Sequence, residues 1–152
     1  MTIFVDADSC PKAARDIVLR RGSSPTAAKA DLKIIFAANR QIPNCAPAQM
    51  ILCSSAENAA DDRIVELAQK GDIVITRDVP LAKRLVDNEI NVIDDRGRVF
   101  NANNINEMLS LRNFMVGLAD NGLEYERTAN YGKKDLKQFA DSFDKLITKL
   151  LN

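Results

Sequence analysis

Short apolar segments rich in β-branched residues alternate with helical segments along much of this 152-residue chain. The segments between them carry apolar residues three and four positions apart, which is the spacing of one helix face. We predict strands at residues 3–6, 33–38, 50–53, 73–76 and 91–93, and helices at 11–21, 59–70 and 80–86. Alternating strands and helices favour a mainly parallel sheet with helices on both faces. The predicted fold is therefore α/β and three-layered.

The remaining segments complete this architecture. We predict loops at 22–31, 39–49 and 117–134, amphipathic helices at 104–118 and 135–151, and a turn at 95–98 that leads into residues 99–100. A polar loop as long as the one at 117–134 is typical of a functional or mobile segment. The length of the chain and its 46% hydrophobic content predict a single domain over residues 1–152.

Composition excludes several kinds of chemistry. The chain has no histidine, which excludes Ser-His-Asp and Cys-His catalysis, HExxH zinc sites and imidazole proton shuttles. Its 21 acidic and 21 basic side chains give a formal net charge of zero, so no overall attraction to nucleic acid is expected. Three irregularly spaced cysteines fit neither a disulfide framework nor a zinc knuckle. Without a signal peptide or a membrane-spanning segment, we expect a cytoplasmic protein that does not contact membranes.

Two carboxylates end the first predicted strand. Asp6 and Asp8 follow Ile3-Phe4-Val5, and Pro11 then begins a helix. Ligands of α/β proteins bind outside the carboxyl ends of parallel strands, and two acids there repel each other unless a cation neutralises them. Oxygen ligands suit Mg²⁺ or Mn²⁺. One interpretation is a divalent metal site; the other is that Asp8 or Ser9 caps the helix while Asp6 is solvated.

Two more acids are predicted to reach the same edge of the sheet. Asp61 shares a helix face with apolar Ile64 and Val65, which must pack on the sheet, so it points inward. Asp78 follows the strand 73–76 as Asp8 follows the first strand, and it also suits the N-cap of the next helix. Asp62 falls on the polar helix face, and Asp72 lies at the opposite end of its strand. We therefore take Asp6, Asp8, Asp61 and Asp78 as candidate catalytic and metal-binding residues.

Polar neighbours of these acids are candidate substrate contacts. Ser9 and Thr76 place hydroxyl groups at the same strand ends, and Arg77 lies between Thr76 and Asp78, where it would reach a substrate phosphate.

Several motifs together resemble one bacterial family. They are Thr2-Ile-Phe-Val-Asp-Ala-Asp-Ser-Cys-Pro11, Ala60-Asp61-x-x-Ile64-Val65, Gly71-Asp72-Ile-Val-Ile-Thr76-x-Asp78-x-Pro-Leu-Ala82, Arg96-Gly97, and Leu109-x-x-Arg112-x-Phe114-Met115. Over nearly the whole chain these residues are similar to the YaiI/YqxD family, which is placed by resemblance among PIN-like domains. The resemblance implies a ribonuclease that depends on Mg²⁺ or Mn²⁺ and uses an acidic rim, here Asp6, Asp8, Asp61 and Asp78. It also brings Arg112 into the set of predicted substrate contacts.

The leading hypothesis is a metal-dependent nuclease or phosphodiesterase that acts on RNA or another nucleic acid. A second hypothesis is a domain that binds RNA, a nucleotide or a protein without cleaving it, because PIN nucleases carry an early helical Glu that has no clear counterpart here. A third is a phosphatase of the haloacid-dehalogenase type, since Asp6-Ala-Asp8-Ser-Cys10 partly matches its nucleophile motif.

Overall fold

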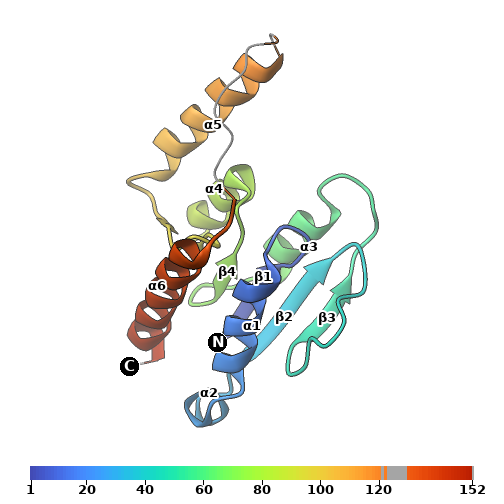
Figure 1. Ribbon diagram of the computed structural model, residues 1–152, viewed down its shortest axis with the longest axis vertical. Helices are drawn as coiled ribbons and strands as arrows, with labels where there is room; N and C mark the ends of the chain where they lie inside the picture. Colours follow the sequence, from blue (N-terminus) through green and yellow to red (C-terminus); the bar gives the residue numbers. More distant parts are fainter. Residues whose placement is uncertain (121, 123–129, 152) are drawn as a thin grey trace.

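In the computed structural model, helices cover a six-stranded sheet on both faces (Figure 1). The structure describes residues 1–120, 122 and 130–151. The strands are β1 (Thr2–Asp6), β2 (Lys33–Ala38), β3 (Gln49–Leu52), β4 (Ile73–Ile75), β5 (Asn91–Ile93) and β6 (Val99–Phe100). The helices are α1 (Lys12–Gly22), α2 (Pro25–Lys29), α3 (Ala59–Leu67), α4 (Val79–Asp87), α5 (Ile105–Asp120) and α6 (Lys133–Leu151). The predicted three-layer α/β fold is confirmed, and it is consistent with a PIN-like fold.

The strand order, β3-β2-β1-β4-β5-β6, places β1 at the centre of the sheet. The first five strands in this order are parallel to one another, and β6 pairs antiparallel with β5. The register sets Val5 of β1 level with Phe36 of β2 and Ile75 of β4. The chain first moves outward from β1 through β2 and β3, and then places β4 on the other side of β1. The carboxyl ends of β1 and β4 are therefore the point where strand order reverses, which is where open α/β sheets bind ligands.

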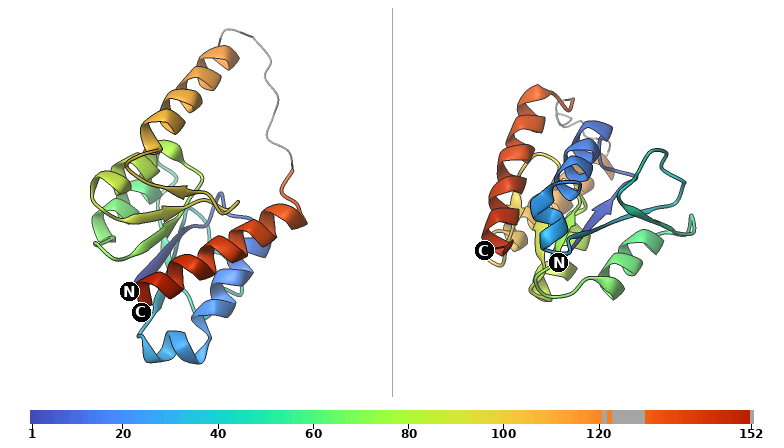
Figure 2. Two further views of the ribbon diagram at one scale, coloured as in Figure 1. Left: turned by 90° about the vertical axis from the view of Figure 1, so that its left-hand side faces the viewer. Right: turned by 90° about the horizontal axis from the view of Figure 1, so that it is seen from below.

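Alternate side chains of β1 enter two separate cores, as expected for a strand that is covered on both faces. Ile3 and Val5 belong to the core with α1 and α6, in which the rings of Phe139 and Phe143 stack with centroids 5.4 Å apart. Phe4 belongs to the other core, with residues of α3 and α4. Helices α1 and α6 lie side by side over one face of the sheet (Figure 2).

Two predictions of local structure are wrong. Residues 22–31 are not wholly a loop, because Ser24 caps the short helix α2: its hydroxyl accepts the N–H of Ala27 at 3.1 Å, and Pro25 occupies the first helical position. Helix α3 ends at Leu67 and does not reach Lys70. Its C-cap, Ala68, is extended, and the next N–H, that of Gln69, donates to the carboxylate of Asp72 instead of continuing the helix.

Helix α5 extends the predicted helix 104–118 to Asp120 and projects away from the rest of the molecule (Figure 1). Within it only Ile105 is buried, while Leu111 and Phe114 are more than half exposed. The predicted loop 117–134 is shorter at both ends, since α5 ends at Asp120 and α6 begins at Lys133; residues 121 and 123–129 of that loop lie outside the described residues. Among the helices that the structure describes, none is long and apolar enough to cross a membrane.

Candidate functional site

The candidate site lies where the sheet reverses its strand order, at the carboxyl ends of β1 and β4. Asp6 is the last residue of β1, and Thr76, Arg77 and Asp78 follow β4 directly. The helix after β1, α1, covers one face of the sheet, whereas the helix after β4, α4, covers the other. The two connections therefore diverge at this point and leave the ends of β1 and β4 open between them.

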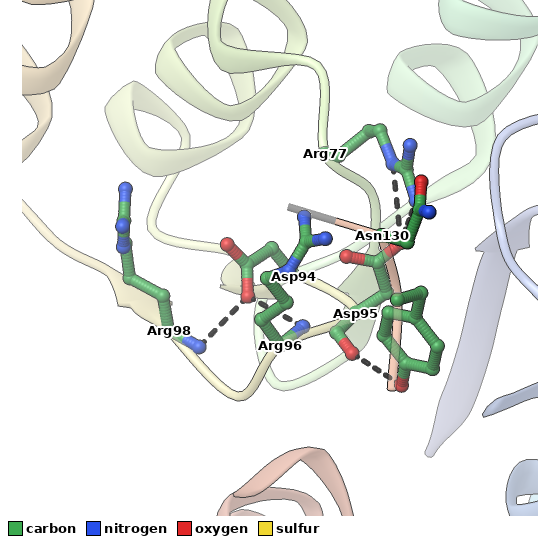
Figure 3. Close-up of a pocket in the computed structure, with 7 residues that line it drawn as sticks. Arg77, Asp94, Asp95, Arg96, Arg98 and Asn130 are labelled. Carbon is green, nitrogen blue, oxygen red and sulfur yellow. Dashed lines mark hydrogen bonds and ion pairs between the residues drawn. The ribbon is translucent and has the colours of Figure 1, made fainter. Parts of the chain in front are cut away.

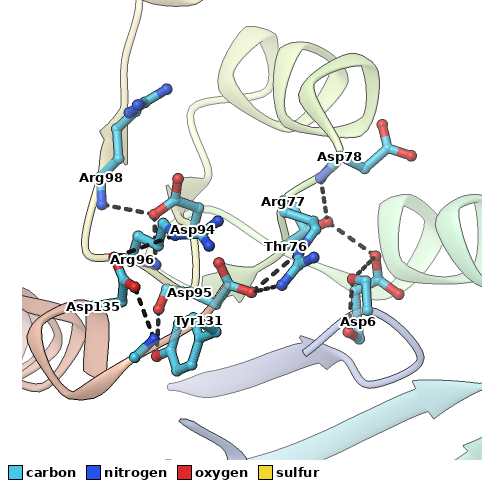
Figure 4. A network of polar contacts seen from close by, with 12 residues as sticks. Asp6, Thr76, Arg77, Asp78, Asp94, Asp95, Arg96, Arg98, Tyr131 and Asp135 are labelled. Atoms are coloured by element: carbon cyan, nitrogen blue, oxygen red, sulfur yellow. Dashed lines mark hydrogen bonds and ion pairs between the residues drawn. The ribbon is translucent and has the colours of Figure 1, made fainter. Parts of the chain in front are cut away.

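Asp6 is buried, so it is not the solvated acid of the alternative interpretation. One carboxylate oxygen, Oδ2, accepts the hydroxyl of Thr76 at 3.0 Å and the hydroxyl of Ser9 at 3.2 Å (Figure 4). Burial raises the pKa of Asp6; the two hydroxyl donors oppose that rise, while the negative charges of Asp78 and Asp8 add to it. Within the described residues no hydrogen bond reaches the other oxygen, Oδ1, which is therefore available to a ligand.

Thr76 connects Asp6 with Asp78. Its hydroxyl donates to Asp6 and accepts the backbone N–H of Asp78 at 3.0 Å. The Asp78 carboxylate also caps α4, because Oδ1 accepts the N–H of Leu81 at 3.0 Å. The predicted N-cap role of Asp78 is confirmed, and the cap holds this side chain at the strand end.

Asp61 reaches the same position from the first turn of α3 and is half-buried. Its pKa is raised to about 6, first by desolvation and then by the negative charges of Asp78 and Asp6, while Arg84 acts in the opposite direction. Asp62, the next residue, is exposed and pairs with Arg84 at 2.9 Å. As predicted, Asp61 therefore points inward and Asp62 points outward.

Asp8 contacts the segment that follows β2, and its charge still acts on Asp6. It is exposed, its carboxylate accepts the N–H of Asn39 at 2.8 Å, and it lies 3.6 Å from Nε of Arg40. It does not cap α1, whose N-cap is Pro11 and has no side-chain hydrogen bond. Asp72 is buried at the other end of β4 and accepts the N–H groups of Thr2 and Gln69, in keeping with the structural role predicted for it.

The two predicted arginine contacts have different surroundings. Arg77 is half exposed at the site, and its Nε donates to Oδ2 of buried Asp95 at 3.1 Å, with a second bond from Nη2 to the same oxygen. Arg112 is exposed on the projecting helix α5, where its guanidinium donates to Asn113 at 3.3 Å. The structure thus brings Arg77 to the acidic rim and leaves Arg112 on a separate element.

Apart from Arg77, sequence reasoning missed a group of residues beside this rim. A cavity of about 440 Å³ is lined by residues of the β5–β6 turn, by Arg77 and by residues that precede α6 (Figure 3): Arg77, Asp94, Asp95, Arg96, Arg98, Asn130 and Tyr131. The available signal was that Asp94 and Asp95 follow β5, the neighbour of β4, and so lie at the same edge of the sheet as Thr76 and Asp78. The sequence predicts only a turn at residues 95–98 here.

Comparison with known proteins gives the family. The family model described as "Uncharacterized BCR, YaiI/YqxD family" matches residues 4–149. The chain belongs to the YaiI/YqxD family. The resemblance inferred from the motifs is confirmed, although this family description names no activity.

Curated relatives of this YaiI/YqxD member match over almost the whole chain. A "UPF0178 protein" of Treponema denticola is 47% identical over 151 residues, covering 99% of this chain and 94% of its own. A "UPF0178 protein" of Treponema pallidum is 44% identical over 153 residues, with 99% and 84% covered. A third, from Pseudomonas aeruginosa, is 40% identical over 152 residues, with 99% and 92% covered. No solved structure matches the chain.

The acids of this YaiI/YqxD chain suit a cation that is bound by few protein ligands. Among the described residues, no three Asp, Glu, His or Cys side chains lie close enough together to hold a metal ion. Mg²⁺ is usually bound by only one or two carboxylates together with waters and substrate phosphates. Asp61 and Asp78 would supply those two carboxylates, since Asp78 acts directly on Asp61, and the charge of Asp6 acts on it as well. The oxygen-only donor set therefore fits Mg²⁺ or Mn²⁺ and does not fit a zinc site.

Proposed function

We propose that this protein is a divalent-metal-dependent phosphodiesterase that cleaves RNA. The observation that carries the proposal is the convergence of Asp6, Asp61 and Asp78 at the reversal of strand order, where the pKa of Asp61 is raised to about 6. Carboxylates that repel one another at a ligand-binding edge of a sheet are typical of sites in which a bound cation neutralises them.

Each residue has a role that follows from its contacts. Asp61 and Asp78 would hold Mg²⁺ or Mn²⁺, which when bound activates water and neutralises charge on the phosphate. Thr76 keeps Asp6 and Asp78 at a fixed spacing through its two hydrogen bonds. Arg77, held by Asp95, presents its remaining N–H groups to a substrate phosphate. The choice of RNA rests on the PIN-like resemblance, with which the order of β3, β2, β1, β4 and β5 is consistent.

Cleavage of a labelled single-stranded RNA in Mn²⁺, Mg²⁺ or EDTA tests the proposal. We expect the wild type to cleave only with a divalent metal, and Asp61→Asn and Asp78→Asn to be slower by at least about 100-fold, because each removes a charged ligand. Asp62→Asn is the matched control, since it changes the adjacent, outward acid, and it should cleave like the wild type. Asp8→Asn tests the fourth predicted acid, with a smaller loss expected from its contacts to Asn39 and Arg40. Absence of cleavage in every metal would refute the proposal.

One observation favours a second function, RNA binding without cleavage: no three acids of the described residues form a metal-binding group. Saturable RNA binding without products in any metal would select this alternative. The same samples should be offered a generic aryl phosphate, because rapid turnover of that compound would instead favour the phosphatase hypothesis.

A further inference from the structure

The cavity beside the acidic rim presents arginines to solvent and keeps its acids buried. Asp94 and Asp95 are both buried, and the Asp95 side chain is only 4% exposed against 47% for that of Arg77. Asp94 uses Oδ1 to accept the backbone N–H groups of Arg96 and Arg98, at 2.9 and 2.8 Å. A ligand entering the cavity therefore meets guanidinium groups, while these two carboxylates are occupied within the protein.

The surroundings fix two of the three arginines. Asp95 receives two bonds from Arg77, both on Oδ2, and the other N–H groups of that guanidinium have no partner in the described part of the chain. The guanidinium of Arg96 lies 5.7 Å from the centre of the Tyr131 ring and 3.3 Å from Asp135. Tyr131 is itself fixed, because its hydroxyl donates to the carbonyl of Asp95 at 2.7 Å. Side chains held in this way lose little rotamer freedom when they bind an anion.

Arg98 is the third arginine that lines the cavity, and it follows Gly97 in the β5–β6 turn. It is exposed, and no carboxylate of the described residues pairs with its guanidinium. Figure 4 shows two sets of contacts that meet at adjacent residues: Thr76 bonds to Asp6, and its neighbour Arg77 bonds to Asp95 beside the β5–β6 turn. Arg77 thus belongs to both the acidic rim and the cavity, so one ligand can occupy both.

We propose that this cavity binds the terminal phosphate of an RNA strand whose neighbouring phosphodiester lies at the acidic rim. The proposal rests on the proposed function, and it adds the requirement for a phosphorylated strand end. Guanidinium groups recognise phosphate through paired N–H donors, and a terminal phosphomonoester carries more charge than an internal diester. A cavity of about 440 Å³ lies toward the small end of ligand pockets and has room for a terminal phosphate with its nucleotide.

Binding is measured in EDTA, so that neither metal nor cleavage contributes. Three short RNA oligonucleotides of one sequence, with a 5′-phosphate, a 3′-phosphate or hydroxyls at both ends, compete for a fluorescent probe strand. We expect one phosphorylated form to bind at least about 10-fold more tightly than the hydroxyl form, the effect of a charge-assisted contact. Arg98→Ala should abolish this preference. Arg20→Ala, which removes an equally exposed arginine from the last turn of α1, should keep it.

Equal affinity for all three oligonucleotides would overturn the inference, as would an end preference that survives in Arg98→Ala. Arg98→Lys adds a check on geometry: it keeps the charge but loses the paired donors, so its preference should be weaker than that of the wild type. The two proposals fail separately. A protein that prefers phosphorylated ends in EDTA but never cleaves RNA with Mn²⁺ or Mg²⁺ refutes the phosphodiesterase, whereas one that cleaves all three strands equally refutes the end-binding cavity.

Discussion

Replacing Asp61 with Asn should stabilise the metal-free protein while removing its affinity for metal. At neutral pH the Asp61 carboxylate is partly desolvated and faces the charges of Asp78 and Asp6. Asn has nearly the same shape and carries no charge, so it removes that repulsion. A residue that is kept at a cost in stability is typical of a functional site.

The magnitude follows from the pKa of Asp61, which rises from 3.8 to about 6. A rise of about 2 pKa units corresponds to about 3 kcal/mol at most. Since Asp61 is only half-buried, solvent screening reduces this to about 1 kcal/mol. The folded state binds the proton more tightly than the unfolded state, so the wild type loses this stability as the pH rises from about 4 to about 6. Above about pH 6 the wild type has lost the whole of this contribution to its free energy of unfolding.

Urea unfolding in EDTA measures the effect, with Asp62→Asn as the matched control. Both acids lie in the first turn of α3, so both substitutions lose the same favourable interaction with the helix dipole. We expect Asp61→Asn to exceed Asp62→Asn in free energy of unfolding by about 1 kcal/mol near pH 7.5, and the gap to narrow as the pH falls and to close below about pH 4. Saturating Mn²⁺ should reverse the order, because it stabilises only chains that bind it, by about 2.7 kcal/mol at 100 times Kd. An Asp61→Asn protein less stable than Asp62→Asn in EDTA would refute the reasoning.

Three other substitutions or modifications test parts of the structure away from the acids. Asp72→Ala should lower the free energy of unfolding by about 2 kcal/mol, because it removes the buried carboxylate that accepts the part-buried hydrogen bonds from Thr2 and Gln69, and calorimetry should find its Mn²⁺ affinity unchanged. Gly97→Ala should lower the unfolding free energy by more than about 1 kcal/mol, since Gly97 has a φ of 86° and a Cβ there would lie 2.5 Å from the carbonyl oxygen of Gln138; wild-type stability in urea would contradict this packing of the turn on α6. Burial raises the pKa of Cys10 to about 12, so iodoacetamide at about pH 8 should label Cys10 only after unfolding, and rapid labelling of the folded protein, seen by mass spectrometry, would place it at the surface.

The sequence predicts the sheet well because its signal is local. Apolar segments such as Lys33–Ala38 must be strands, and the structure gives β2 the same bounds. Helix α2 was predictable in principle, since Ser24-Pro25 is a cap followed by a first-turn proline, but its five residues are too few to show a helical period. The apolar residues of α5 predict a helix correctly but do not say what covers them, and in the structure only Ile105 is buried while Leu111, Phe114 and Val116 are exposed.

The candidate site is less predictable because it depends on how loops bend. Asp61 was placed correctly, since its position on a helix face follows from the periodicity that puts Ile64 in the core. For Asp8 the strand alternation does not decide where the side chain points, because the chain turns after Asp6; its carboxylate contacts Asn39, and its role at the site stays a prediction. The contact of Tyr131 with Asp95 joins residues 36 positions apart, which no local pattern indicates.

Titration of Mn²⁺ by calorimetry, with and without a non-cleavable RNA analogue, tests the central claim most directly. We predict that Mn²⁺ binds the wild type saturably and binds more tightly with the analogue, because the phosphate supplies metal ligands at a site with few protein ligands. Binding should be lost in Asp61→Asn and kept in Asp62→Asn. Failure of the wild type to bind Mn²⁺ either alone or with the analogue would contradict the account.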